Sequence, residues 1–146
     1  MKKLVIATML ATVGLMASAA EVGVSGIHDI AANKDGVRVT ASVGSVAGFT
    51  PQLSVSRVDT VYTRYAVGTQ YAITKVGPVA LAATASGVYQ DTIGGTTGYG
   101  ATAGLKASVA LNKGVDLVAG VERFMGQDRI SASNGTVTSV GLNVKF

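Results

Sequence analysis

The chain has 146 residues and no cysteine, and only 14% of its residues are charged, against roughly 25% in a typical globular domain. A chain of this length holds a single domain, and no disulfide can stabilise it. The formal net charge of +4 is not gathered into a basic stripe, so the composition does not favour nucleic-acid binding.

The first 20 residues are predicted to be a secretory signal peptide. A short positive start precedes an apolar run at 4–16 and a small-residue cleavage site at 17–20. The apolar run is too short to span a bilayer, which takes about 20 residues. Cleavage after Ala20 leaves 21–146 as one domain.

In chain order, alternation of apolar and polar residues predicts eight strands, at 21–32, 37–48, 51–58, 62–74, 78–90, 98–111, 115–126 and 136–146. In the second strand Gly44 and Ser45 are interpreted as a bulge. Arg57 interrupts the apolar face of the third strand. The sixth strand is the clearest, because every second residue from Tyr99 to Leu111 is apolar or aromatic. Strands of this length suit a tilted membrane crossing of about 9–11 residues.

Turn chemistry gives a second indication of the register. The apolar faces of neighbouring strands match if three-residue loops at 75–77 and 112–114 connect them, with Ile73 opposite Val79. Both loops end in glycine, which adopts the left-handed conformation that this loop type needs. The connections after odd-numbered strands contain longer polar stretches, at 32–36, 91–97 and 127–135. Short turns at one end and longer loops at the other are typical of outer-membrane barrels.

The aromatic residues favour a membrane barrel over a soluble one. No stretch after the leader has about 18 consecutive apolar residues, so a transmembrane helix is not available. A soluble sandwich would place its aromatics in the core centre, whereas a membrane barrel places them in two girdles at the water interface. The predicted girdles are Phe49, Tyr71 and Phe146 at the periplasmic, short-turn end, and Tyr62, Tyr65, Tyr89, Tyr99 and Phe124 at the loop end.

The last strand carries a recognisable pattern, Ser139-x-Gly141-x-x-Val144-x-Phe146. It resembles the C-terminal β-signal of Gram-negative outer-membrane proteins. The mature chain resembles the small eight-stranded barrels of the OmpA/OmpX type, an opacity- or porin-like barrel domain. The resemblance implies an all-β, eight-stranded antiparallel up-and-down transmembrane barrel in the cell outer membrane. It also implies contact with membrane lipid and lipopolysaccharide, and with the barrel-assembly machinery during biogenesis, but it leaves the function open.

The polar face predicts a lumen filled by opposite charges. Alternation places eight charged residues inside, together with Gln70 and Asn143: Glu21, Asp29, Arg38, Arg64, Lys106, Asp116, Glu122 and Lys145. Buried charges must be paired, and the register places Lys106 diagonally from Glu122. The charges therefore form either a salt-bridged plug or a narrow ion path that is gated by re-pairing.

The sequence does not indicate a catalytic, metal-binding or cofactor-binding site. The single histidine, His28, precedes Asp29, and adjacent strand residues point to opposite faces. We therefore expect His28 to face lipid and Asp29 not to orient it, and no enzyme activity is predicted. With one histidine and no cysteine, no metal site is expected, and no glycine-rich phosphate loop or cofactor site is present.

Three functions remain open at this point. The first is a structural or surface-adhesion barrel, whose charged loops would contact host or phage surfaces. The second is a narrow ion-conducting porin. The third is a soluble secreted barrel that binds a small apolar ligand, in which the Ala/Val face would point inward.

Overall fold

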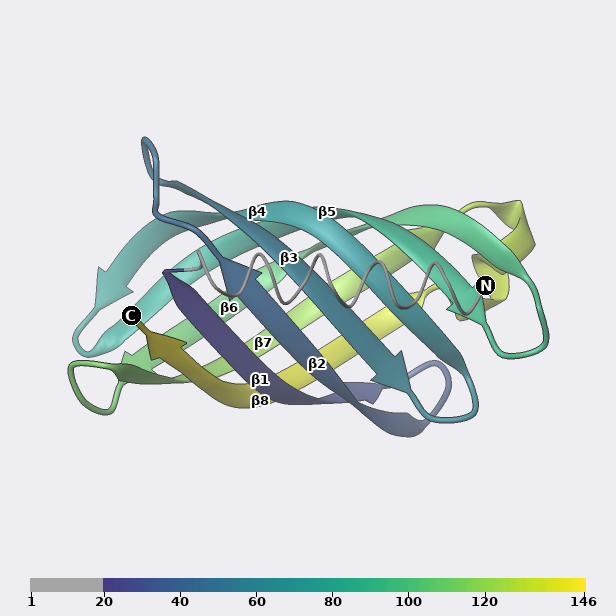
Figure 1. The fold of residues 1–146 in the computed structure, drawn as a ribbon, viewed down its shortest axis with the longest axis horizontal. Helices are drawn as coiled ribbons and strands as arrows, with labels where there is room; N and C mark the ends of the chain where they lie inside the picture. Colours follow the sequence, from purple (N-terminus) through teal and green to yellow (C-terminus); the bar gives the residue numbers. More distant parts are fainter. Residues whose placement is uncertain (1–19) are drawn as a thin grey trace.

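The computed structural model describes residues 20–146, so the predicted leader lies outside the described residues except for Ala20. The described chain forms eight antiparallel strands that close into one barrel (Figure 1). The strands are β1 Glu21–Asp29, β2 Lys34–Ser42, β3 Phe49–Val58, β4 Tyr62–Val76, β5 Val79–Thr92, β6 Thr97–Ala110, β7 Val115–Gly126 and β8 Gly135–Lys145. A short 3-10 helix, η1 (Asp128–Ser133), lies between β7 and β8.

Closure of the barrel is made by the first and last strands. Each strand pairs with the next along the chain, and β8 returns to pair with β1, where Val24 lies opposite Leu142. The strands are strongly tilted against the long axis (Figure 1), as a closed barrel requires. Closure leaves no free sheet edge. The predicted fold class, an eight-stranded antiparallel up-and-down transmembrane barrel, is confirmed.

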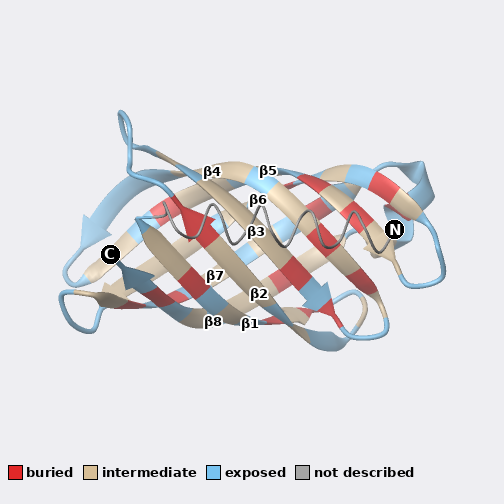
Figure 2. Ribbon diagram, in the orientation of Figure 1, coloured by how far each residue is buried: buried red, intermediate tan, exposed pale blue. Residues whose placement is uncertain are grey.

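The two faces of the wall differ in chemistry. Val67 and Val140, which point outward, are 67% and 62% exposed, whereas the inward Gln90 and Asp29 are 0% and 2% exposed. Buried and exposed positions alternate along the strands (Figure 2). Large apolar residues outside and polar residues inside are the reverse of a soluble protein and typical of a membrane barrel. The soluble alternative required the apolar face to point inward, and that orientation is wrong.

The second strand ends earlier than predicted. β2 stops at Ser42, and residues 43–48 form a hairpin that leaves the wall. Ala47 and Gly48 have φ values of 52° and 84°, and Val46 pairs with Phe49 across this tight turn. Two successive positive φ values match the turn type that best suits a two-residue hairpin. The predicted bulge within this segment is therefore wrong.

The turn between β4 and β5 also differs from the prediction. β4 continues to Val76, which lies opposite Val79, and Gly77 (φ 59°) and Pro78 form the turn. The register shifts at Ile73, between Ala72 and Thr74. The predicted pairing of Ile73 with Val79 is wrong because a bulge and a two-residue turn replace the three-residue loop.

The loop at 112–114 does separate β6 and β7, but the interaction that completes this turn differs from the predicted one. The Leu111 amide donates to the Val115 carbonyl at 2.9 Å, which matches the expected register. Gly114, however, is not left-handed. Its amide donates to Oδ1 of Asn112 at 2.8 Å, so the asparagine side chain completes the turn.

The two ends of the barrel are less different than expected. Three connections lie at the end that also holds residues 20 and 146, here called the turn end: β2–β3, β4–β5 and β6–β7. The other four lie at the opposite end, here called the loop end. The predicted long loops at 32–36 and 91–97 shrink to 30–33 and 93–96, because the flanking strands extend further. The β7–β8 connection, with η1, is the longest one.

Candidate functional site

The charged residues predicted for the lumen all occupy inward positions of their strands, and they fall into two layers. The loop-end layer consists of Asp29, Arg38, Arg64 and Glu122. The turn-end layer consists of Glu21, Lys106, Asp116 and Lys145. Each layer contains two acids and two bases, so each is electrically balanced.

Asp29, at the end of β1, is the centre of the loop-end layer. Tyr62 Oη donates to its Oδ2 at 2.6 Å, and the Ala32 amide donates to its Oδ1 at 3.0 Å. Nη2 of Arg64 lies 4.0 Å from Oδ2. Both carboxylate oxygens of this buried side chain therefore have partners, as a buried charge requires.

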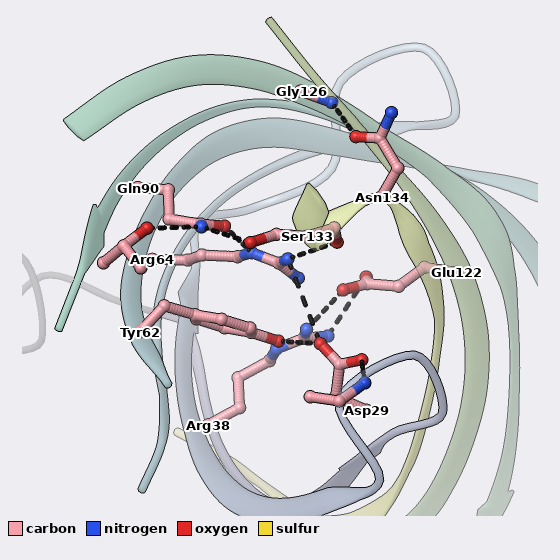
Figure 3. A network of polar contacts seen from close by, with 11 residues as sticks. Asp29, Arg38, Tyr62, Arg64, Gln90, Glu122, Gly126, Ser133 and Asn134 are labelled. Atoms are coloured by element: carbon pink, nitrogen blue, oxygen red, sulfur yellow. Dashed lines mark hydrogen bonds and ion pairs between the residues drawn. The ribbon is translucent and has the colours of Figure 1, made fainter. Parts of the chain in front are cut away.

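Arg64, which Figure 3 shows beside the Tyr62 ring, lies between two aromatic rings in the middle of this layer. Its Cζ is 3.8 Å from the ring centroid of Tyr62 and 3.7 Å from that of Phe124. Its Nε donates to Gln90 Oε1 at 2.7 Å, and its Nη2 donates to the Ser133 carbonyl at 3.2 Å. The rings and the polar partners together stabilise a guanidinium that is only 3% exposed.

The aromatic partners of Arg64 correct the girdle prediction. Tyr62 and Phe124 were expected on the outer face, but they point into the lumen and are 1% and 0% exposed. Tyr62 lies two residues before Arg64, and Phe124 lies two residues after Glu122. The alternation that placed the charges inside therefore places these rings inside too. The girdle prediction used position along the chain and overlooked this parity.

A second ion pair crosses the lumen from β2 to β7. Nη1 of Arg38 donates to Oε2 of Glu122 at 3.1 Å, and its Nη2 contacts Oε1. The side chains are 15% and 17% exposed. The predicted register is confirmed, since Gly104 lies opposite Glu122 and Lys106 is diagonal to it, but Glu122 makes its ion pair with Arg38 and not with Lys106. The prediction considered neighbours along the wall, whereas Arg38 reaches Glu122 across the barrel.

The η1 segment covers the mouth of the lumen at the loop end. Ile130 is 2% exposed and packs with Val88 and Phe124. Nε2 of Gln90 donates to Oγ of Ser133 at 2.9 Å. This cover was not predicted, because a short irregular segment has no periodicity in the sequence.

The turn-end layer is more open to solvent. Lys145 Nζ lies 2.7 Å from Asp116 Oδ2, and its side chain is 43% exposed. Lys106 Nζ donates to Gln70 Oε1 at 3.1 Å and lies 4.0 Å from Glu21. Glu21 also accepts a hydrogen bond from Asn143. This layer therefore joins residues from β1, β4, β6, β7 and β8 near the turn end.

A small polar cavity of about 70 Å³ lies between the two layers. Its lining includes Arg38, Arg64 and Glu122 of the loop-end layer and Lys106 of the turn-end layer. Most of the remaining polar lining carries hydroxyl groups: Ser25, Thr40, Ser54, Ser56, Thr84, Ser86, Thr102 and Ser139. Nε of Arg38 and Nη1 of Arg64 are buried without a hydrogen-bond partner among the described residues, so part of the cost of burying these two guanidinium groups is not offset by hydrogen bonds.

The other six girdle residues lie on the outer face. Tyr89 stacks between Tyr65 and Tyr99 toward the loop end, with ring centroids 6.3 Å and 5.4 Å apart. Phe49 and Tyr71 contact each other at the turn end, with centroids 4.8 Å apart. Phe146, at the same end, is 83% exposed.

His28 lies on the outer face, opposite Asp35 of β2. Its Nδ1 is 2.7 Å from Oδ1 of Asp35, while Asp29 contacts Tyr62 inside the barrel. The separation of His28 from Asp29 follows from strand alternation, whereas the contact with Asp35 depends on the β1–β2 register, which alternation alone does not specify. Within residues 20–146, no three His, Asp or Glu side chains are grouped so that they could hold a metal ion.

The β-signal residues lie on β8 or directly after it. Ser139 and Gly141 face the lumen, and Val144 faces outward, opposite Val22 of β1. The Phe146 amide donates to the Ala20 carbonyl at 2.9 Å. The pattern therefore coincides with the seam that closes the barrel.

No helix in the described part of the chain is long and apolar enough to cross a membrane. Comparisons with known proteins bear on the fold. A chain from a study of de novo designed transmembrane β-barrels matches 88% of this chain and 96% of its own, with a TM-score of 0.61 and 15% sequence identity. The crystal structure of Neisserial surface protein A (NspA) matches 86% of this chain and 94% of its own, with a TM-score of 0.46 and 19% identity. No protein-family model and no curated protein match the sequence. The likeness to the designed barrel establishes the fold alone.

Proposed function

We propose that this chain is an integral outer-membrane barrel with a structural role, and that paired charges close its lumen to ions. The observation that carries the proposal is the ion pair of Arg38 with Glu122, which spans the lumen beside the buried Arg64 and Asp29. Both side chains are largely buried, and their charge-assisted two-point contact keeps them in the water path. No catalytic role is part of the proposal.

The proposed location in the outer membrane is supported by the apolar outer face of the barrel and by the predicted signal peptide. An outer face of exposed apolar residues fits the hydrocarbon of a bilayer. Export through the predicted signal peptide at 1–20 would deliver the chain across the inner membrane. The barrel-assembly machinery would then recognise the C-terminal pattern on β8. After insertion, lipid and lipopolysaccharide would surround the wall.

A surface role is the finer part of the proposal. Charges at the loop end would meet the exterior of the cell: the exposed Lys34, Asp59, Asp128 and Arg129 and the half-buried Asp91. They are available for contact with host or phage surfaces. Their mixed sign does not single out a partner.

Two measurements test the proposal. A membrane barrel should need detergent for extraction and should migrate differently on an unboiled gel than on a boiled one. In a planar bilayer, the wild-type protein should show no channel events above baseline. Discrete events would instead support the narrow porin, for which the cavity of about 70 Å³ between the two layers would form part of the path.

A further inference from the structure

The hairpin between β2 and β3 projects from the side of the barrel. It comprises residues 43–48, and every residue from 43 to 49 is exposed (Figure 2). The turns after β4 and β6 continue along the long axis at the turn end, whereas this hairpin leaves the wall sideways (Figure 1). The long axis of a membrane barrel crosses the bilayer, so a sideways projection points into the plane of the membrane.

The base of the hairpin lies at the level of an outward aromatic pair. Phe49 lies opposite Tyr71, and the Gly48 carbonyl accepts a hydrogen bond from the Ala72 amide at 3.3 Å. β4 then continues past Tyr71 as far as Val76. The hairpin therefore leaves the wall before the wall ends, at the height where Phe49 and Tyr71 would mark the membrane interface.

The chemistry of the hairpin suits lipid better than water. There is no charged residue between Arg38 and Arg57. Val46, near the tip, is 72% exposed, and Phe49 is 49% exposed. Val46 and Phe49 exchange two backbone hydrogen bonds, of 2.8 and 3.0 Å, which satisfies these polar groups without water, as a lipid environment requires.

Part of the hairpin limits how deep it can lie. Gly44 and Ser45 form no strand pairing, so their backbone groups need water or headgroups as partners. The interface region offers both polar partners and apolar chains. The depth that fits the whole segment is therefore the interface and not the hydrocarbon centre.

We propose that the β2–β3 hairpin inserts into the interface of the membrane leaflet at the turn end, with Val46 and Phe49 in contact with phospholipid chains. This inference rests on the proposed function, because it requires the barrel to span a bilayer. The hairpin would then fix the depth and rotation of the barrel at that leaflet.

The absence of tryptophan from the sequence allows a direct test. Three single-tryptophan variants are reconstituted in phosphatidylcholine vesicles: Val46→Trp in the hairpin, Val140→Trp at the middle of the outer wall, and Lys113→Trp in another turn at the same end. Emission is recorded with unlabelled lipid and with lipid brominated at one of two acyl-chain depths. We expect Val46→Trp and Val140→Trp to emit at short wavelength and to lose most of their fluorescence to brominated lipid. Lys113→Trp should emit as in water and be little quenched.

The depth series separates the hairpin from the wall. Bromines near the headgroup should quench Val46→Trp most, and bromines deep in the chain should quench Val140→Trp most. If Val140→Trp is quenched while Val46→Trp behaves like Lys113→Trp, the hairpin inference is wrong and the membrane barrel stands. If Val140→Trp is not quenched, the proposed function fails, and the inference fails with it. A blue-shifted Val46→Trp that is unquenched by lipid and changes with protein density would indicate a protein contact and overturn the lipid assignment.

Discussion

Arg64 shows how a single charged side chain is accommodated inside this barrel. An isolated buried charge is strongly unfavourable, and an arginine does not become neutral to avoid that cost. Here the guanidinium is held by two ring faces, by Gln90 and by the Ser133 carbonyl, with Asp29 nearby. The same Asp29 accepts a hydrogen bond from the Tyr62 hydroxyl. The arrangement of Arg64 therefore depends on the hydroxyl of Tyr62 as well as on its aromatic ring.

Tyr62→Phe keeps the ring beside Arg64 but removes the hydroxyl that donates to Asp29. Leaving a buried carboxylate oxygen without this partner should lower the free energy of unfolding by about 1–3 kcal/mol. Urea unfolding in lipid vesicles measures the change. Tyr99→Phe is the matched control, because Tyr99 is 63% exposed on the outer face. Equal stability of the two variants would show that the Asp29 contact is not important.

The Arg38–Glu122 pair should behave as one unit. Either Arg38→Met or Glu122→Leu leaves a largely buried charge unpaired and should cost about 3–5 kcal/mol. The double variant removes both charges, so its loss should be clearly smaller than the sum of the single losses. The same unfolding measurement on all three variants gives the coupling energy. Additive losses would mean that the two side chains do not interact.

At the scale of elements, the strands were predictable, but most of their ends were not. Period-two alternation follows directly from strand geometry, and β7 was predicted at the observed bounds. The hairpin after β2 and the bulge at Ile73 were not predicted, because small residues at 43–48 and mixed residues at 72–76 do not show clearly where the period-two phase changes. The pairing of Arg38 with Glu122 escaped prediction for another reason: alternation assigns a face, but it does not say which side chains meet across the lumen.

The η1 segment should be the most easily detached part of the loop end. Its attachment relies on Ile130, which is 2% exposed against Val88 and Phe124. Ile130→Ser should weaken this packing and free the segment, so that trypsin cleaves after Arg129 faster than in the wild type.

Ile93→Ser provides the control for this change. Ile93 lies in the β5–β6 connection and is 55% exposed, so its replacement should leave cleavage after Arg129 unchanged. Mass spectrometry of timed digests of the refolded proteins identifies the cut. An Ile130→Ser protein that is cleaved after Arg129 no faster than the wild type would show that the segment is held by its polar contacts alone.

At the scale of the whole molecule, the two charge layers lie in series along one water path, with the hydroxyl-lined cavity between them. If each layer closes the path on its own, opening one layer leaves the other as the barrier. One variant replaces Asp29, Arg38, Arg64 and Glu122 with serine, and a second variant replaces Glu21, Lys106, Asp116 and Lys145 with serine. Each loses two acids and two bases, so the net charge does not change. Removing Arg64 also empties the space between the Tyr62 and Phe124 rings.

We expect neither four-residue variant to conduct in a planar bilayer, and the protein that carries all eight changes to show channel events. The physical reason is that ion flow through barriers in series is set by the higher one, so the two sets of changes must act together. Different migration of boiled and unboiled samples on a gel confirms that each variant still forms a barrel. If the first set alone conducts as well as the combined set, the loop-end layer is the sole barrier, and the more solvent-exposed turn-end layer, where Lys145 is 43% exposed, is already open to ions in the wild type.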